Sequence, residues 1–325
     1  MSSSLSKFSK NESSVQKKNH NTVSSDNIAV KNKGMGKLER NRVIMSWTFV
    51  IIPTFFILLF YFYPMVQAFW LSLHTGAGVN LTFTGFDNYR RLFSDQAFIA
   101  ALTNTFIFLV FQIPLMIILA LVFSVILNQK TLKLKGIFRT LVFLPSITSL
   151  VAYSLVFRYL FSNNGIVNQI LMGINLIDSP VLWLGDPFWA RVLIIIAITW
   201  RWTGYNMIFY LSALQNVSPS IYEAARIDGA SAVQQFFKIT IPMLRPVILF
   251  TSITSTIGTL QLFDEPMNLT GGGPGNATTT LSQYIYNLSF QFTPNFGYAS
   301  AVSYTIVVFV VILSAIQFRL GRERK

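Results

Sequence analysis

The chain has 325 residues, of which 52% are hydrophobic and only 11% are charged, with a formal net charge of +13 and no cysteine. Because soluble domains carry about a quarter charged residues, this shortage indicates an integral membrane protein. The absence of cysteine excludes disulfides and thiolate metal sites. Positive charge is concentrated near the N-terminus and in short segments between apolar runs, which disfavours a nucleic-acid interface.

Residues 1–36 are rich in Ser, Asn and Lys and show no hydrophobic periodicity, so we expect a disordered cytoplasmic tail. Residues 37–325 then form one membrane domain. The first apolar run begins near Val43 and is long, which is typical of a retained signal anchor rather than a cleaved signal peptide.

Six apolar runs are long enough for a helix that crosses the hydrocarbon core, which needs about 20 residues. They are about 43–73, 103–127, 137–161, 190–213, 240–263 and 298–318. The segments 128–139 and 319–325 are basic, whereas 162–189 and 264–297 contain no Lys or Arg. The positive-inside rule therefore predicts that both termini and the polar segment 218–246 are cytoplasmic. The predicted fold is an all-α integral membrane domain with six transmembrane helices.

The segment 218–246 has the features of a short helix–turn–helix. Ser218 can cap a helix that has Pro219 at its first position, and Ser220 with Glu223 matches a capping box. Gly229 is expected to end this helix in the left-handed conformation. A second helix over 230–240 should then end before Pro242.

The same segment resembles the EAA loop of the membrane subunits of ABC importers. Six positions match the family's spacing, namely Glu223, Ala224, Ala225, Gly229, Ile239 and Pro242, while Ile241 replaces a leucine. Other segments resemble, in order, the sugar-uptake branch of these permeases, and specifically the maltose-permease-like subunit. They are Phe83 to Tyr89, Asn104-Thr105, Phe138-Arg139 with Phe143-Leu144-Pro145, Trp183-Leu184, Leu269 to Pro274 and Gly297-Tyr298-Ala299.

The resemblance implies a subunit that does not hydrolyse ATP itself. It implies two ATPase subunits that hold ATP and Mg, a second homologous permease subunit and an extracytoplasmic sugar-binding protein. This chain itself would hold no cofactor and no metal, and we find no catalytic constellation in it. In the family the first helix of the loop docks on the ATPase, so the expected ATPase-coupling residues are Glu223, Ala224, Ala225, Asp228, Gly229 and Pro242.

The resemblance also implies a sugar cavity between the fourth and fifth spans. Aromatic rings stack on sugar faces, while hydroxyls and amides bond sugar OH groups. Alternatively, these polar side chains hydrogen-bond neighbouring helices, as is common inside membranes. The candidate substrate-binding residues are Trp202, Tyr205, Asn206, Ser255, Thr259, Gln261 and Leu262.

Arg201 places a charge within the fourth span, which is costly unless it faces a partner or a water-filled cavity. Because no Asp or Glu lies in any predicted span, its expected partner is backbone, solvent, substrate or another subunit. An acidic sugar and a subunit interface both fit. Arg191, near the outer end of the same span, is expected to snorkel.

The leading hypothesis is therefore the permease subunit of a binding-protein-dependent sugar importer, for an oligosaccharide, in a bacterial plasma membrane. The composition is typical of an AT-rich bacterial genome. An ion-coupled secondary transporter would need intramembrane carboxylates and an internal repeat, and the sequence shows neither. A membrane-anchored sensor would need a sizeable soluble domain, which the short external segments do not provide.

Overall fold

The computed structural model describes residues 37–76, 81–129 and 131–321. The predicted tail over 1–36 lies outside these residues. The chain divides into two compact units, of which the first ends at Tyr63 and the second begins at Pro64. Each unit is described by itself.

The first unit contains α2 (Lys37–Ile57) followed by the π-helical turn η1 (Leu58–Phe62). From Val43 onward its side chains are mostly apolar on every side, and Phe55, Phe56 and Phe60 are all exposed. A helix that is apolar all round is suited to lipid rather than water. The unit belongs to a run, Leu38–Ser72, that is long and apolar enough to cross a membrane.

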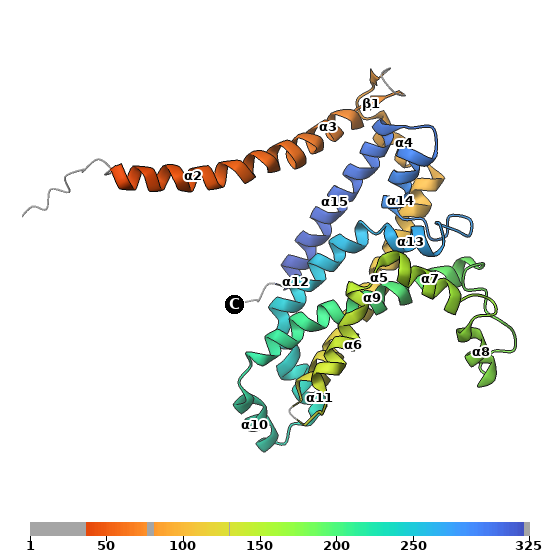
Figure 1. Ribbon diagram of the computed structural model, residues 1–325. Coiled ribbons are helices and arrows are strands. Elements are labelled where there is room, and N and C mark those ends of the chain that lie inside the picture. The colour runs from red at the N-terminus through yellow and green to blue at the C-terminus, as the bar shows by residue number, and fades with distance from the viewer. Residues whose placement is uncertain (1–36, 77–80, 130, 322–325) are drawn as a thin grey trace, which may run out of the picture. The chain divides into compact units, whose positions relative to one another are not determined.

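The second unit is a helical bundle with a short antiparallel hairpin in which His74 pairs with Phe83 and Thr75 with Thr82 (Figure 1). Its elements are α3 (Tyr63–Ser72), β1 (His74–Thr75), β2 (Thr82–Phe83), α4 (Asp87–Leu92), α5 (Gln96–Asn128), α6 (Lys135–Ile147), α7 (Leu150–Leu160), α8 (Ile166–Gly173), α9 (Pro187–Gln215), α10 (Pro219–Ile227), α11 (Ala232–Gln235), η2 (Phe236–Thr240), α12 (Ile241–Leu260), α13 (Asp264–Leu269), α14 (Leu281–Tyr286), η3 (Asn287–Gln291) and α15 (Phe296–Gly321).

The centre of this unit is the packing of α5 against α9, with α6 and α12 against the same pair and α15 against α12. Both central helices begin at side-chain caps. Asp95 accepts a hydrogen bond from Ala97 N, and Asp186 accepts from Phe188 N and Trp189 N with Pro187 at the first turn. At 1.5 Å per residue, both exceed the roughly 30 Å hydrocarbon core.

The prediction of one continuous helix over 137–161 is wrong. That stretch forms α6 and α7, which meet at an angle of 99°. Thr148 and Ser149 between them have extended backbones, with ψ of 141° and 131°, and Pro145 removes a backbone donor in the last turn of α6. Within the described residues, five helices are long and apolar enough to span a membrane, or six if this bent pair is one span.

The expected helix end before Pro242 is also wrong. Residues Ala232–Leu260 run continuously through α11, η2 and α12. The π-helical turn Phe236–Thr240 widens the helix just before Pro242. This removes the conflict between the proline ring and the preceding turn that ends a regular helix.

Candidate functional site

A cavity of about 370 Å³ lies among α5, α9, α12 and the short helix α13. Its floor and walls combine aromatic, hydroxyl and amide side chains with three charged ones. The lining residues are Gln112, Met116, Ile198, Arg201, Trp202, Tyr205, Asn206, Thr254, Ser255, Gly258, Thr259, Gln261, Leu262, Phe263, Asp264 and Glu265.

The structure brings all seven sequence-predicted substrate residues to this cavity, together with Arg201. Trp202 and Tyr205 present large surfaces, with exposed fractions of 36% and 44%. Their rings meet edge to face with centroids 5.8 Å apart. This pair forms an aromatic wall on α9 that can stack on an apolar ring face.

Two of the predicted residues also make contacts between helices. The Thr259 hydroxyl of α12 donates to Gln112 Oε1 of α5 at 3.1 Å. Asn206 Nδ2 donates to Trp202 O at 3.0 Å and to Met116 Sδ at 3.3 Å. For these two side chains, the interhelical role considered from the sequence is present in the structure.

Sequence reasoning missed the contributions of α5 and α13 to the cavity. Gln112 and Met116 come from α5, and Asp264 and Glu265 from α13. A glutamine inside an apolar run was a usable signal, because polar groups at membrane depth need a partner. The two acidic residues follow directly after the fifth predicted span, so the apolar runs alone did not include them.

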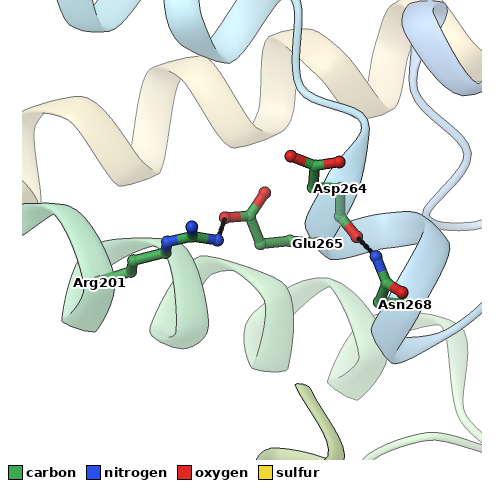
Figure 2. Close-up of polar contacts among 4 residues, drawn as sticks. All are labelled: Arg201, Asp264, Glu265 and Asn268. Carbon is green, nitrogen blue, oxygen red and sulfur yellow. Dashed lines mark hydrogen bonds and ion pairs between the residues drawn. The ribbon is translucent and has the colours of Figure 1, made fainter. Parts of the chain in front are cut away.

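The expectation that Arg201 has no acidic partner in this chain is wrong. Its Nη1 lies 3.4 Å from Glu265 Oε1, and the exposed fractions of the two side chains are 14% and 4% (Figure 2). The guanidinium also lies over the rings of Tyr153 and Trp202, 5.1 Å and 5.5 Å from their centroids. Its Nε is buried without a hydrogen-bond partner among the described residues.

The second site predicted from the sequence is α10, at the end of the second unit away from α4 and α14 (Figure 1). None of its nine residues is buried. Glu223, Ala224, Asp228 and Gly229 are exposed and Ala225 is half-buried. Pro242, also expected to couple, is exposed on the long helix that follows.

The end of α10 has the expected glycine geometry. Gly229 has φ of +78°, and Gly229 N and Ala230 N donate to Arg226 O and Ala225 O at 3.1 and 2.8 Å. This pair of bonds is the Schellman motif, which satisfies the last carbonyls of the helix. The helix end predicted at Gly229 is confirmed.

The start of α10 differs from the expectation. Ser218 makes no side-chain cap, and its hydroxyl instead bonds that of Ser220 at 2.8 Å. The predicted capping box of Ser220 and Glu223 is therefore wrong, since Ser220 lies inside the helix. A capping box does form one helix later, between Ser231 and Gln234.

A hydrogen bond joins α10 to the long helix that follows it. The Tyr222 hydroxyl lies 3.1 Å from Thr240 Oγ1 in η2. Gln235 Nε2 donates to Ala230 O in the turn at 2.8 Å. The exposed helix α10 is thus fastened to the continuous helix that lines the cavity with Ser255 and Thr259.

The segment Leu269 to Pro274 leads into a loop that is hydrogen-bonded to both central helices. Asn104 Nδ2 of α5 donates to Asn276 O and Thr279 O at 2.8 and 3.0 Å. Arg191 Nε of α9 donates to Ala277 O at 2.9 Å and to Asn104 Oδ1 at 3.2 Å. The loop thus supplies acceptors for Arg191, and its expected snorkelling stays a prediction.

Asp95, the cap of α5, collects a second set of contacts. It accepts hydrogen bonds from the hydroxyls of Tyr284 and Tyr298 at 2.5 and 2.6 Å. Burial raises the pKa of the Asp95 carboxyl, but these hydroxyls and the N–H of Ala97 outweigh it and leave the pKa below its ordinary value of 3.8. The ionised carboxylate therefore joins α5, α14 and α15.

Comparison with known proteins identifies relatives along most of the chain. Residues 128–325 match the family described as binding-protein-dependent transport system inner membrane component. The lactose transport system permease protein LacF of Rhizobium radiobacter is 56% identical over 290 residues, covering 89% of this chain and 97% of that protein.

Two crystal structures share the fold. One is a bacterial ABC transporter involved in the import of the acidic polysaccharide alginate, with a TM-score of 0.74 and 26% identity over 87% of this chain and 96% of that one. The other is a bacterial alginate ABC transporter in complex with an alginate pentasaccharide-bound periplasmic protein, with a TM-score of 0.73 and 27% identity over 87% and 95%.

Proposed function

The chain belongs to the family of binding-protein-dependent transport system inner membrane components, and from this premise we propose that it forms part of the translocation pathway of an ABC importer for an oligosaccharide. It is a multi-pass membrane protein and a component of a transport system. A relative that transports lactose and fold neighbours that import alginate support a sugar as the cargo.

The observation that carries the proposal is the cavity between α9 and α12. The aromatic wall of Trp202 and Tyr205 can stack on the C–H face of a sugar ring, while Ser255 and Gln261 offer donors and acceptors to its hydroxyls. A volume of about 370 Å³ is within the range of pockets that hold small ligands.

We assign the energy-coupling role to α10. It is exposed, ends in a fixed Schellman turn at Gly229, and is fastened through Tyr222 to the helix that lines the cavity. A short capped helix moves as one piece, so a push on Glu223 or Asp228 reaches the cavity without being absorbed in a loop. In this proposal α10 and both termini are cytoplasmic, and ATP and Mg are held by the ATPase subunits.

The proposed assembly contains this chain, a second homologous permease, two ATPase subunits and an extracytoplasmic sugar-binding protein. One fold neighbour is a transporter in complex with a periplasmic binding protein, which supports the last of these partners. The coupling residues proposed on this chain are Glu223, Ala224, Ala225, Asp228, Gly229 and Pro242.

The test is sugar-stimulated ATP hydrolysis by the complete complex reconstituted in liposomes, with and without its binding protein, across neutral and acidic oligosaccharides. We expect one sugar class to stimulate hydrolysis and uptake, and Glu223→Ala to uncouple the two. The alternative, an ion-coupled secondary transporter, predicts uptake that follows a proton or sodium gradient and ignores ATP. That result, or failure of any ATPase subunit to co-purify, contradicts the proposal.

A further inference from the structure

The charged side chains on the cavity wall determine which sugars the cavity can accept. This inference rests on the proposed function. Among the described residues that line the cavity, Arg201, Asp264 and Glu265 are the charged ones. With all three ionised, the wall carries one positive and two negative charges. Its net charge is therefore negative, although the chain as a whole is strongly basic.

Arg201 is not free to bind a carboxylate ligand. Its guanidinium is 3.4 Å from Glu265, which has an exposed fraction of only 4%. The rings of Tyr153 and Trp202 take up two further sides of it. To pair with Arg201, an acidic sugar would have to displace the buried Glu265 carboxylate. That carboxylate would then have no other cation to pair with on the cavity wall.

Asp264 adds an uncompensated negative charge. Its backbone carbonyl accepts from Asn268 Nδ2 at 2.7 Å, while its carboxylate lies on the side of the Glu265 carboxylate and has no ion pair with Arg201 (Figure 2). Asp264 is exposed and lines the cavity. A carboxylate there accepts hydrogen bonds from neutral hydroxyls and repels another carboxylate.

We propose that this cavity selects uncharged sugars over uronic-acid sugars, and that Glu265 is the specificity-determining residue because it cancels the charge of Arg201. The remaining polar groups on the wall, such as Tyr205, Ser255 and Gln261, are neutral partners for hydroxyls. Removing the Glu265 carboxylate exposes a guanidinium that pairs with an acidic sugar.

The test measures sugar binding to the complete membrane complex in nanodiscs by saturation-transfer NMR, without the binding protein, so that the preference of that protein does not enter. The probes are lactose, maltose and cellobiose, each beside the derivative in which one C6 hydroxymethyl group is oxidised to a carboxylate. The methyl ester of each acid is the neutral control of the same shape.

In the wild type we expect each acid to bind at least about tenfold more weakly than its parent and its ester. Glu265→Gln should reduce this difference to within about threefold. The double variant Arg201→Gln/Glu265→Gln, in which Asp264 is again the charged group, should restore it. Asp264→Asn leaves the Arg201–Glu265 ion pair intact. It should therefore reduce the difference in affinity between each acid and its parent sugar less than Glu265→Gln does.

A buried arginine without its partner can prevent folding, so the folded fraction of each complex is followed by size-exclusion chromatography. If Glu265→Gln does not fold, the affinities of the acids for Arg201→Gln/Glu265→Gln and for Asp264→Asn test the inference instead. Acids that bind the wild type as well as their parent sugars overturn this inference alone. If none of the probes binds, neutral or acidic, the proposed function fails and the inference fails with it.

Discussion

Gly204 of α9 lies directly against the backbone carbonyl of Val142 in α6. A Cβ atom at this position would come closer than 3.0 Å to the Val142 oxygen and to Phe143 Cα. Only a glycine lets the two backbones approach this closely, which is the usual device of helix packing in membranes. The contact fixes α6 against the helix that carries Trp202 and Tyr205.

Gly204→Ala should therefore destabilise the complex by about 1–3 kcal/mol, because the added methyl group forces α6 and α9 apart. The measurement is thermal unfolding in detergent together with sugar uptake. Gly136→Ala is the matched control, since Gly136 lies in the first turn of α6 and has nothing within 4 Å of an added Cβ. Equal melting temperatures for the two variants would contradict the close packing at Gly204.

Substitutions at Gly229 distinguish the cost of backbone strain in this chain from the loss of contact with a partner subunit. Its φ of +78° strains any side chain, and an added Cβ meets nothing within 4 Å in this chain. Gly229→Ala should cost about 1–2 kcal/mol locally, and Gly229→Asn less, because Asn tolerates this conformation. Gly229→Trp should in addition abolish ATP-driven uptake while membrane insertion is unchanged, since in the proposed assembly the indole clashes only with the ATPase that binds α10.

The readouts for these three variants are the amount of complex in the membrane, ATP hydrolysis and uptake. If Gly229→Trp transports as well as Gly229→Ala, the position is not at an ATPase interface. The coupling role proposed for α10 would then be wrong even if the sugar cavity is right.

Trp202 is expected to bind sugar through its ring rather than through its indole N–H. Trp202→Ala should raise the KM of uptake at least about tenfold, as truncating a central aromatic contact commonly does, and Trp202→Phe should recover most of this loss. Trp200→Ala is the control, because Trp200 packs against Tyr153 and Phe157 and does not line this cavity. A larger KM change at Trp200 than at Trp202 would argue against the aromatic wall.

Asp95 makes stability depend on acid pH. Because its folded pKa lies below the ordinary value of 3.8, its stabilising contribution is complete above that value and is lost as the pH falls through the lower folded value. The melting temperature of the wild type should thus fall in this range, and that of Asp95→Ala should fall less. At neutral pH, Asp95→Ala should cost about 1 kcal/mol for the lost helix cap. Parallel curves for the two proteins would contradict this role.

Much of the cavity could be predicted from local spacing. Tyr205 and Asn206 follow Trp202 by three and four positions, and Thr259 and Leu262 follow Ser255 by four and seven, so each set shares one helix face. Where two such faces meet, polar and aromatic groups line a common space. The structure places both sets around the same cavity.

Long-range pairing could not be predicted in this way. Arg201 and Glu265 are 64 residues apart, and their contact depends on α13 turning back over α9 after the apolar run has ended. The π-helical turn before Pro242 was also unpredictable, because its sequence is compatible with a regular helix. Both features come from tertiary packing rather than from local preference.

The bend between α6 and α7 has a consequence for the surrounding lipid. With 13 residues, α6 is about 20 Å long, whereas the hydrocarbon core is about 30 Å thick. On the side of the bundle formed by α6, this helix is shorter than the hydrocarbon core of an ordinary bilayer. If α6 alone meets lipid on this flank, the bilayer thins there, at a cost of fractions of a kcal/mol for each ångström of mismatch. An adjoining protein surface that covers this flank would relieve the deformation, so the membrane itself would favour association on the α6 side.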